Sequence, residues 1–96
     1  MMAENTANSD ASDGENYVYI VACADGTLYT GYTTDVARRV AEHNAGTGAK
    51  YTRGRTPVEL VHVESFSDQS AAMQREYAIK QLRRPAKERL IRQEAS

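Results

Sequence analysis

Stretches of apolar, β-branched and aromatic residues mark three short strands along the chain. Residues 17–23 and 27–32 are rich in β-branched and aromatic side chains, and an Ala-Asp-Gly segment at 24–26 separates them. Two such stretches around an Asp-Gly pair are typical of a β-hairpin. Residues 58–66, which follow Pro57, have a similar composition and predict a third strand.

The loop of this hairpin decides which tyrosines share a face of the sheet. A two-residue turn would put Tyr19 and Tyr29 on opposite faces. A three-residue loop, with Gly26 in the left-handed conformation and a G1 bulge, pairs Tyr19 with Gly31 instead. Tyr29 then lies on the same face as Tyr19, and Gly31 leaves room beside the two rings. We expect the three-residue loop.

The segment after the hairpin predicts a helix that ends at Asn44. The Thr-Thr-Asp sequence at 33–35 supplies a hydroxyl N-cap and a carboxylate for the first turn. Valines and alanines then recur at helical spacing. Arg39 and His43 are four residues apart, so they share one face of this helix and lean toward the sheet.

Two further helices follow the third strand. Ser67 or Asp68 caps the first of them. Its expected inward stripe consists of Ala71, Ala72, Arg75, Ala78, Ile79 and Leu82. Glu76 lies beside this stripe, so a carboxylate borders the buried face. Pro85 interrupts the helix and starts a last short one, which ends near Gln93.

The predicted order is therefore strand, strand, helix, loop, strand, helix, helix. This order indicates the α+β class, with a three-stranded antiparallel sheet flanked by helices. A chain of 96 residues makes one domain, which we assign to residues 17–93. Residues 1–16 hold four acidic residues and no basic one, which is typical of a disordered tail, and residues 94–96 form a short tail at the other end.

Composition narrows the classes of protein. The longest apolar run, residues 17–24, is shorter than the roughly 18 residues of a membrane span, so we expect no membrane partner. The polar, acidic start lacks the basic and apolar regions of a secretory signal, and a single cysteine cannot form an internal disulfide. We therefore expect a soluble, cytoplasmic protein. Outside residues 1–16 the chain has 12 basic against 9 acidic residues.

Two tyrosine-centred triplets carry a resemblance to a known family. Tyr-Val-Tyr at 17–19 stands at the GIY position of the GIY-YIG nucleases, and Tyr-Thr-Gly at 29–31 stands at their YIG position. Arg39 falls ten residues after Tyr29, where that family has its arginine. The resemblance extends from residue 17 to about residue 91. The chain looks most like the small stand-alone, YhbQ-like members, and is similar to the amino-terminal nuclease domain of UvrC and to the Slx-type catalytic subunit.

This resemblance implies a metal-dependent endonuclease that hydrolyses DNA phosphodiester bonds, in branched or damaged DNA during repair. Glu76 corresponds to the family's metal-binding glutamate and would hold one Mg²⁺ or Mn²⁺, chiefly through water molecules. Arg39 would bind phosphate oxygens. Tyr19, assisted by Tyr29 or His43, would orient and deprotonate the attacking water. A nearby guanidinium and metal ion would favour the phenolate form of the tyrosine that this chemistry needs.

The same resemblance implies where DNA binds. The loop at 44–57 contains three basic residues and no acidic one. Lys50, Arg53 and Arg55 would follow backbone phosphates, and Tyr51 would stack on a base. RNA remains an alternative ligand, as does a protein partner or a homodimer. A nucleic-acid-binding module with little cleavage of its own is the alternative function, because a fold does not ensure an activity.

One departure from the family pattern concerns the end of the domain. Several family members carry an asparagine after the glutamate, whereas no asparagine follows Asn44 in this chain. Any contact that this side chain makes with metal or substrate is therefore absent here or made by another residue. The first two residues of the GIY triplet and the middle residue of the YIG triplet also differ, in ways that the small branch shares.

Overall fold

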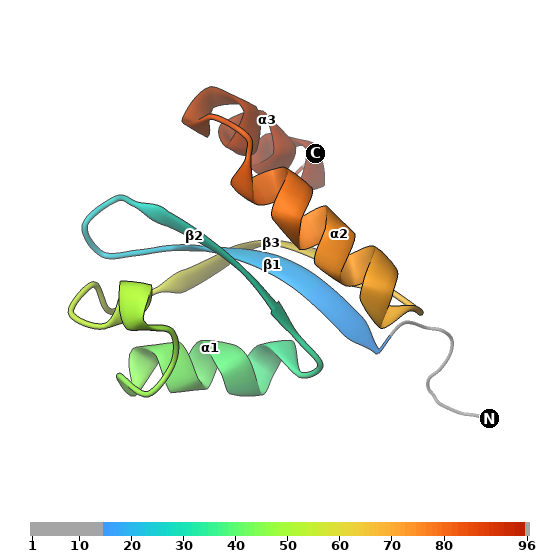
Figure 1. Cartoon of the computed structure of the whole chain (residues 1–96). Coiled ribbons are helices and arrows are strands. Elements are labelled where there is room, and N and C mark those ends of the chain that lie inside the picture. Colours follow the sequence, from blue (N-terminus) through green and yellow to red (C-terminus); the bar gives the residue numbers. More distant parts are fainter. Residues whose placement is uncertain (1–14, 96) are drawn as a thin grey trace.

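The computed structural model of the chain describes residues 15–95, which form a three-stranded sheet with three helices (Figure 1). The strands are β1 (Asn16–Ala22), β2 (Leu28–Thr33) and β3 (Glu59–Phe66). The helices are α1 (Val36–Asn44), α2 (Gln69–Lys80) and α3 (Arg84–Ala95), and a short 3₁₀ turn, η1 (Lys50–Thr52), lies in the basic loop. The predicted order of strands and helices is confirmed. The predicted disordered tail lies outside the described residues, apart from its last two.

The sheet separates two helical layers. Its order is β2-β1-β3, and both pairs of neighbouring strands are antiparallel. α1 lies against one face, whereas α2 and α3 lie against the other (Figure 1). Side chains alternate along β1, so the central strand contributes to a core on each side. Val18 and Ile20 pack with Ala72 and Ile79 of α2, while the opposite face packs Tyr19, Val21, Cys23 and Val58 with Tyr29 and Val40.

The β1–β2 hairpin has the three-residue loop that the sequence predicts. Gly26 has a φ of 87°, the N–H of Cys23 donates to the carbonyl of Thr27 at 2.8 Å, and Tyr19 pairs with Gly31. A left-handed glycine at the end of such a loop is the signature of a G1 bulge. The expected register is therefore confirmed, and it places Tyr19 and Tyr29 on the face that α1 covers.

The start of α1 differs from the expectation of a hydroxyl cap. Asp35 is the N-cap itself, since its carboxylate accepts the N–H of Arg38 at 3.0 Å. Thr33 acts one step earlier, where its hydroxyl oxygen accepts the N–H of Asp35 at 3.1 Å. Asp35 has an extended backbone, which lets a short carboxylate reach back to the helix end. The prediction of the helix was right, and the assignment of its cap was wrong.

The predicted inward stripe of α2 is wrong in part. Ala72 and Ile79 are fully buried, but Ala78 and Leu82 are exposed. A single helix crossing a narrow, twisted sheet touches it along a line, so residues at the sides of the stripe stay in solvent. Arg75 instead donates two hydrogen bonds to Glu64 of β3, at 2.8 and 3.0 Å. Asp68 caps α2 through the N–H of Ala71, as one of the two predicted alternatives requires.

The basic loop between α1 and β3 is tied down at its base. The side chain of Asn44 donates to the carbonyl of Val58 at 3.2 Å and accepts the N–H of Val58 at 2.6 Å. Near the far end of the loop, the carbonyl of Arg55 accepts the N–H of Ala24 at 2.8 Å, and the Arg55 guanidinium contacts Asp25 at 2.6 Å. The loop is thereby held against the hairpin turn. No helix within residues 15–95 is long and apolar enough to cross a membrane.

Candidate catalytic site

Tyr19 lies at the centre of the candidate site and is fully buried. Its ring crosses the backbone of Gly31 on the neighbouring strand, where a Cβ atom would lie only 2.5 Å from the phenol oxygen. A side chain at position 31 would therefore displace the ring. The ring of Tyr29 is 6.4 Å from that of Tyr19 between centroids, and His43 of α1 is 5.8 and 5.4 Å from Tyr19 and Tyr29 respectively.

A chain of buried hydrogen bonds starts at the Tyr19 phenol. The phenol oxygen is 2.7 Å from Nε2 of His43, and Nδ1 of His43 is 2.8 Å from Oγ1 of Thr52 in η1. The Thr52 hydroxyl donates in turn to the carbonyl of Ala49 at 2.9 Å. His43 and Thr52 are fully buried, as Tyr19 is. The chain joins β1, α1 and the basic loop at one point.

The protonation of this chain follows from its burial. Burial raises the pKa of Tyr19 to about 12, although an interaction with the Arg39 guanidinium lowers it. Burial and the positive charge of Arg39 lower the pKa of His43 below its ordinary value. At neutral pH the tyrosine is therefore a phenol and the histidine is neutral. The expected phenolate is not present in the protein by itself, because the cost of burying its charge exceeds the effect of the guanidinium.

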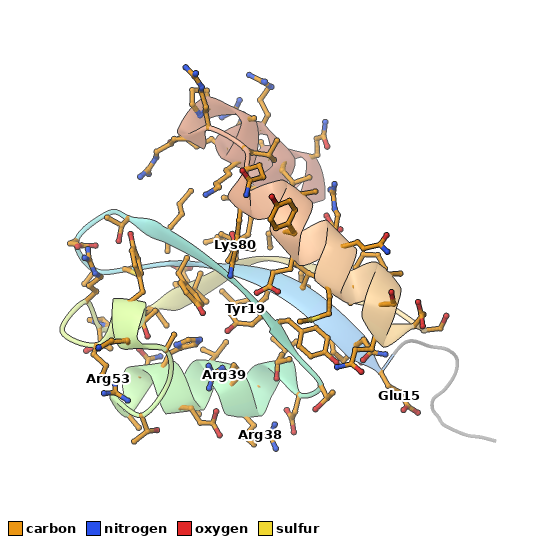
Figure 2. The ribbon with its side chains drawn as sticks, in the orientation of Figure 1. Glu15, Tyr19, Arg38, Arg39, Arg53 and Lys80 are labelled. Atoms are coloured by element: carbon orange, nitrogen blue, oxygen red, sulfur yellow. The ribbon has the colours of Figure 1, made fainter. Side chains whose placement is uncertain are left out.

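Arg39 lies beside Tyr19 and is held by Glu42. Its Nη1 atom is 3.0 Å from the carboxylate of Glu42, which also lies 3.7 Å from Arg38. The hydrogen bond to Glu42, with a smaller contribution from Tyr19, raises the pKa of Arg39, so the guanidinium is always charged. Figure 2 shows Arg39 on the α1 side of the sheet and Lys80 on the α2 side, with Tyr19 between them in this view.

Tyr51 and Arg55 of the basic loop belong to an aromatic stack at the edge of the site. The Tyr51 ring stacks on Tyr29 with centroids 5.7 Å apart, and the Arg55 guanidinium lies 4.4 Å from the centre of the Tyr51 ring. Because Arg55 is also paired with Asp25, this arginine and this ring already have partners. Lys50 and Arg53 are exposed and form no ion pair among the described residues.

Glu76 lies in α2, in the other helical layer, yet its charge acts on the Tyr19 phenol and raises its pKa. Its carboxylate is largely buried and forms an ion pair with Lys80 at 3.1 Å. Residues 15–95 contain no group of three or more His, Cys, Asp or Glu side chains that could hold a metal ion. The candidate ligand at this site is the carboxylate of Glu76. Mg²⁺ accepts such a site, since it retains most of its waters, but it would have to compete with the Lys80 ammonium.

The chain matches the family described as the GIY-YIG catalytic domain over residues 15–89, which include every residue of this site. The chain belongs to the GIY-YIG family. Within it, a UPF0213 protein of Natronomonas pharaonis is 70% identical over 80 residues, which cover 83% of this chain and 94% of the relative. These names assign a domain and a branch of the family but no specific substrate.

Two solved structures share the fold. The solution structure of a UPF0213 protein of Bacillus halodurans has 54% identity and a TM-score of 0.53. The match covers 79% of this chain and 81% of the other chain. A solution structure of a protein from E. faecalis has 46% identity and a TM-score of 0.57, and the match covers 81% of this chain and 83% of the other. The three-stranded sheet with three helices is thus the fold of this GIY-YIG branch.

The structure gathers Tyr19, Tyr29, Arg39 and His43 into one cluster, and it leaves Glu76 on the opposite layer within electrostatic reach. Sequence reasoning did not identify three further residues of the site, Glu42, Thr52 and Lys80. Glu42 and Lys80 carry a detectable signal, because each is three or four residues from its partner on one helix. Thr52 has no such signal, since its partner is nine residues away in a different element.

Proposed function

We propose that this GIY-YIG protein is a metal-dependent endonuclease that hydrolyses phosphodiester bonds in DNA. The observation that carries the proposal is the buried hydrogen bond between Tyr19 and a neutral His43 beside Arg39, in a chain that matches a catalytic domain over most of its length. A phenol bonded to a neutral imidazole is an acid–base pair, and an adjacent guanidinium is suited to a phosphate. A purely structural tyrosine needs neither neighbour.

In the proposed reaction, the attacking water gives its proton to the phenol oxygen of Tyr19 as the phenol proton moves to Nε2 of His43. The phenolate is then never formed as a free, buried charge, which avoids the cost that a pKa of about 12 expresses. Tyr29, whose ring contacts both partners, orients the water. General acid–base catalysis of this kind contributes about 10²–10⁴-fold to a rate.

Arg39 would bind the non-bridging oxygens of the phosphate and stabilise the charge that develops on them. To do so it must leave Glu42, so substrate binding exchanges one carboxylate for a phosphate. Glu76 would hold the divalent ion, Mg²⁺ or Mn²⁺, after release of Lys80, and the ion would supply further positive charge to the phosphate and the leaving oxygen when bound.

A nucleic-acid-binding module without appreciable cleavage is the second candidate. Two observations favour it: the phenol is fully buried before substrate binds, and the carboxylate for the metal is occupied by an ammonium. Both would make the isolated protein slow unless DNA opens the site. In this case Lys50 and Arg53 would still hold DNA, and a protein partner would be needed for cleavage.

The two candidates are separated by incubating the full-length protein with labelled branched, nicked, duplex and single-stranded DNA and with RNA. Each substrate is tested with Mg²⁺, with Mn²⁺ and with EDTA. We expect metal-dependent products from at least one DNA, and loss of these products in Arg39→Ala and Glu76→Ala with the fold retained by circular dichroism. Binding that persists in EDTA without any product in either metal would support the binding module and contradict the nuclease.

A further inference from the structure

The position of Thr52 bears on which ring nitrogen of His43 carries the hydrogen. It lies in η1, between exposed Tyr51 and exposed Arg53, yet it is fully buried. A hydroxyl carries one hydrogen, and that hydrogen is donated to the carbonyl of Ala49. With its hydrogen donated to Ala49, the Thr52 oxygen is the acceptor for His43, and this arrangement requires a hydrogen on Nδ1 of His43.

The state of the other ring nitrogen follows. A neutral imidazole has one N–H, so a hydrogen on Nδ1 leaves Nε2 as an acceptor. The partner of Nε2 is the Tyr19 phenol at 2.7 Å, which must then donate its hydrogen to the ring. Assigning the Thr52 hydrogen to Ala49 therefore gives one direction to all the hydrogen bonds from Tyr19 to Ala49, with the phenol proton pointing toward His43.

The surroundings hold the ring in this orientation. Gly48 packs against the imidazole so closely that a Cβ atom there would lie 2.5 Å from Nδ1. The ring therefore has no room to move toward Gly48. Tyr29 lies 5.4 Å from the ring between centroids, in an edge-to-face arrangement. The ring is fixed by packing, while its tautomer is selected by the hydroxyl.

We propose that Thr52 is a positioning residue that holds His43 in the Nδ1–H tautomer, so that Nε2 can accept the proton of Tyr19. This inference rests on the proposed function for its catalytic consequence. When the proton moves, the O–H bond of Tyr19 breaks and an N–H bond forms at Nε2, while the phenol oxygen takes a proton from the attacking water, which becomes the hydroxide nucleophile. The resulting imidazolium keeps its Nδ1–H bond to Thr52. Since η1 also carries Lys50 and adjoins Arg53, the basic loop takes part in both DNA contact and proton transfer.

The tautomer is measured directly by two-bond ¹H–¹⁵N correlation spectra of the histidine rings in the full-length protein at pH 7.5. The chain has only two histidines, His43 and His62, so His43→Gln assigns the signals. We expect Nδ1–H in the wild type and in Thr52→Ser, and an Nε2–H or mixed state in Thr52→Val. Thr30→Val is the matched control, because Thr30 is buried on the other face and its hydroxyl has no partner among the described residues.

The kinetic arm uses single-turnover cleavage of the DNA that the wild type cuts best. We expect Thr52→Val to slow cleavage at least tenfold, and by no more than the roughly 10²–10⁴-fold that general acid–base catalysis contributes, while the dissociation constant for DNA changes less than about twofold. Thr52→Ser and Thr30→Val should stay within about threefold of the wild-type rate. Rescue by serine separates a hydroxyl effect from a loss of packing.

Four outcomes would overturn the inference: Nε2–H in the wild type, an unchanged tautomer in Thr52→Val, an altered tautomer with an unchanged cleavage rate, or equal losses in Thr52→Ser and Thr52→Val. If the wild type cleaves no DNA, the proposed function fails. In that case the spectra alone still decide whether Thr52 selects the tautomer. Failure of the function and failure of the inference are therefore distinguishable.

Discussion

At the scale of single residues, the site places a permanent charge beside buried groups that are neutral. Tyr19 and His43 lie in a fully buried environment that favours their neutral forms, while Arg39 beside them is permanently charged. Glu42 balances this charge in the absence of DNA, at 3.0 Å from the guanidinium. In the proposed reaction a phosphate would replace Glu42 as the partner of Arg39. Glu42 would therefore compete with the substrate.

Removing this competitor should strengthen DNA binding. We expect Glu42→Gln to raise affinity for duplex DNA in EDTA about fivefold, equivalent to about 1 kcal/mol, because it frees Arg39 and removes one negative charge near the phosphate. Fluorescence anisotropy with a labelled duplex measures the change. Glu59→Gln removes the same charge from an exposed strand position and should have a smaller effect. An equal gain in both variants would mean that net charge, rather than Arg39, sets affinity.

At the scale of elements, the basic loop depends on a few anchoring hydrogen bonds. The Asn44 side chain pairs with both backbone groups of Val58 and closes the loop at its base. Between residues 45 and 57 Thr52 is the one buried residue, so these bonds, together with the stacking of Tyr51 on Tyr29, hold the loop in place. Sequence composition indicates only a basic loop. The anchor at Asn44 is visible only when α1 and β3 are side by side.

Loss of the Asn44 anchor should loosen the loop without unfolding the sheet. Asn44→Ala removes two hydrogen bonds, which we expect to cost about 1–3 kcal/mol, and to speed trypsin cleavage after Lys50 and Arg53. Limited digestion with mass spectrometry locates the cuts. Asp35→Ala removes the N-cap of the same helix at a cost of about 1 kcal/mol and is the control. Loop cleavage that rises equally in both variants would show a general loss of stability instead.

At the scale of the whole molecule, unpaired basic residues gather on two opposite layers. Lys50 and Arg53 lie on the loop of the α1 layer, and Arg53 and Arg39 appear on the same side in Figure 2. Within the described residues, the α3 region also holds cations that form no ion pair, namely Arg83, Lys87, Arg89 and Arg92. Only the first set lies in the layer of Tyr19 and His43. The proposed function therefore assigns DNA to the α1 layer.

Salt dependence tests this assignment. We expect Lys50→Ala and Arg53→Ala to weaken binding about uniformly across DNA sequences and to lower the salt slope by about 0.9 for each duplex phosphate that the variant no longer neutralises. Titrations at several salt concentrations measure the slope. Arg89→Ala removes one exposed charge from α3 and should leave the slope unchanged. A reduced slope in Arg89→Ala alone would place the DNA on the opposite layer.

The stability of the whole fold should depend on the buried histidine. Burial lowers the pKa of His43. As the pH falls, His43 therefore becomes protonated in the unfolded chain before it does in the folded chain. Its contribution is present above the ordinary histidine pKa of about 6.5 and is lost as pH falls below that value, by at most about 1.4 kcal/mol per pH unit. Urea unfolding between pH 8 and pH 5 measures this loss. His43→Gln should flatten the dependence, and an identical slope in both proteins would contradict the assignment.

Local spacing in the sequence was sufficient to predict the sheet, the helices and the register of the hairpin. Side chains alternate along strands and recur every three to four residues along helices, so Tyr19 and Tyr29, and likewise Arg39 and His43, are related by short-range geometry. The loop length follows from Gly26 in the same way. These features depend on neighbours within one or two elements, which the sequence determines by itself.

Tertiary structure decided the protonation states and the hydrogen-bond partners of these residues. The phenol is protonated because packing excludes water from Tyr19, and His43 is oriented by Thr52, which reaches it from another element. Lys80 occupies the carboxylate of Glu76 in a layer that the sheet separates from α1. Burial and hydrogen-bond direction arise from contacts between segments that are far apart in the sequence. A local sequence pattern does not show how close such segments come in space. The sequence therefore determined which residues gather, and the tertiary structure decided their protonation and their partners.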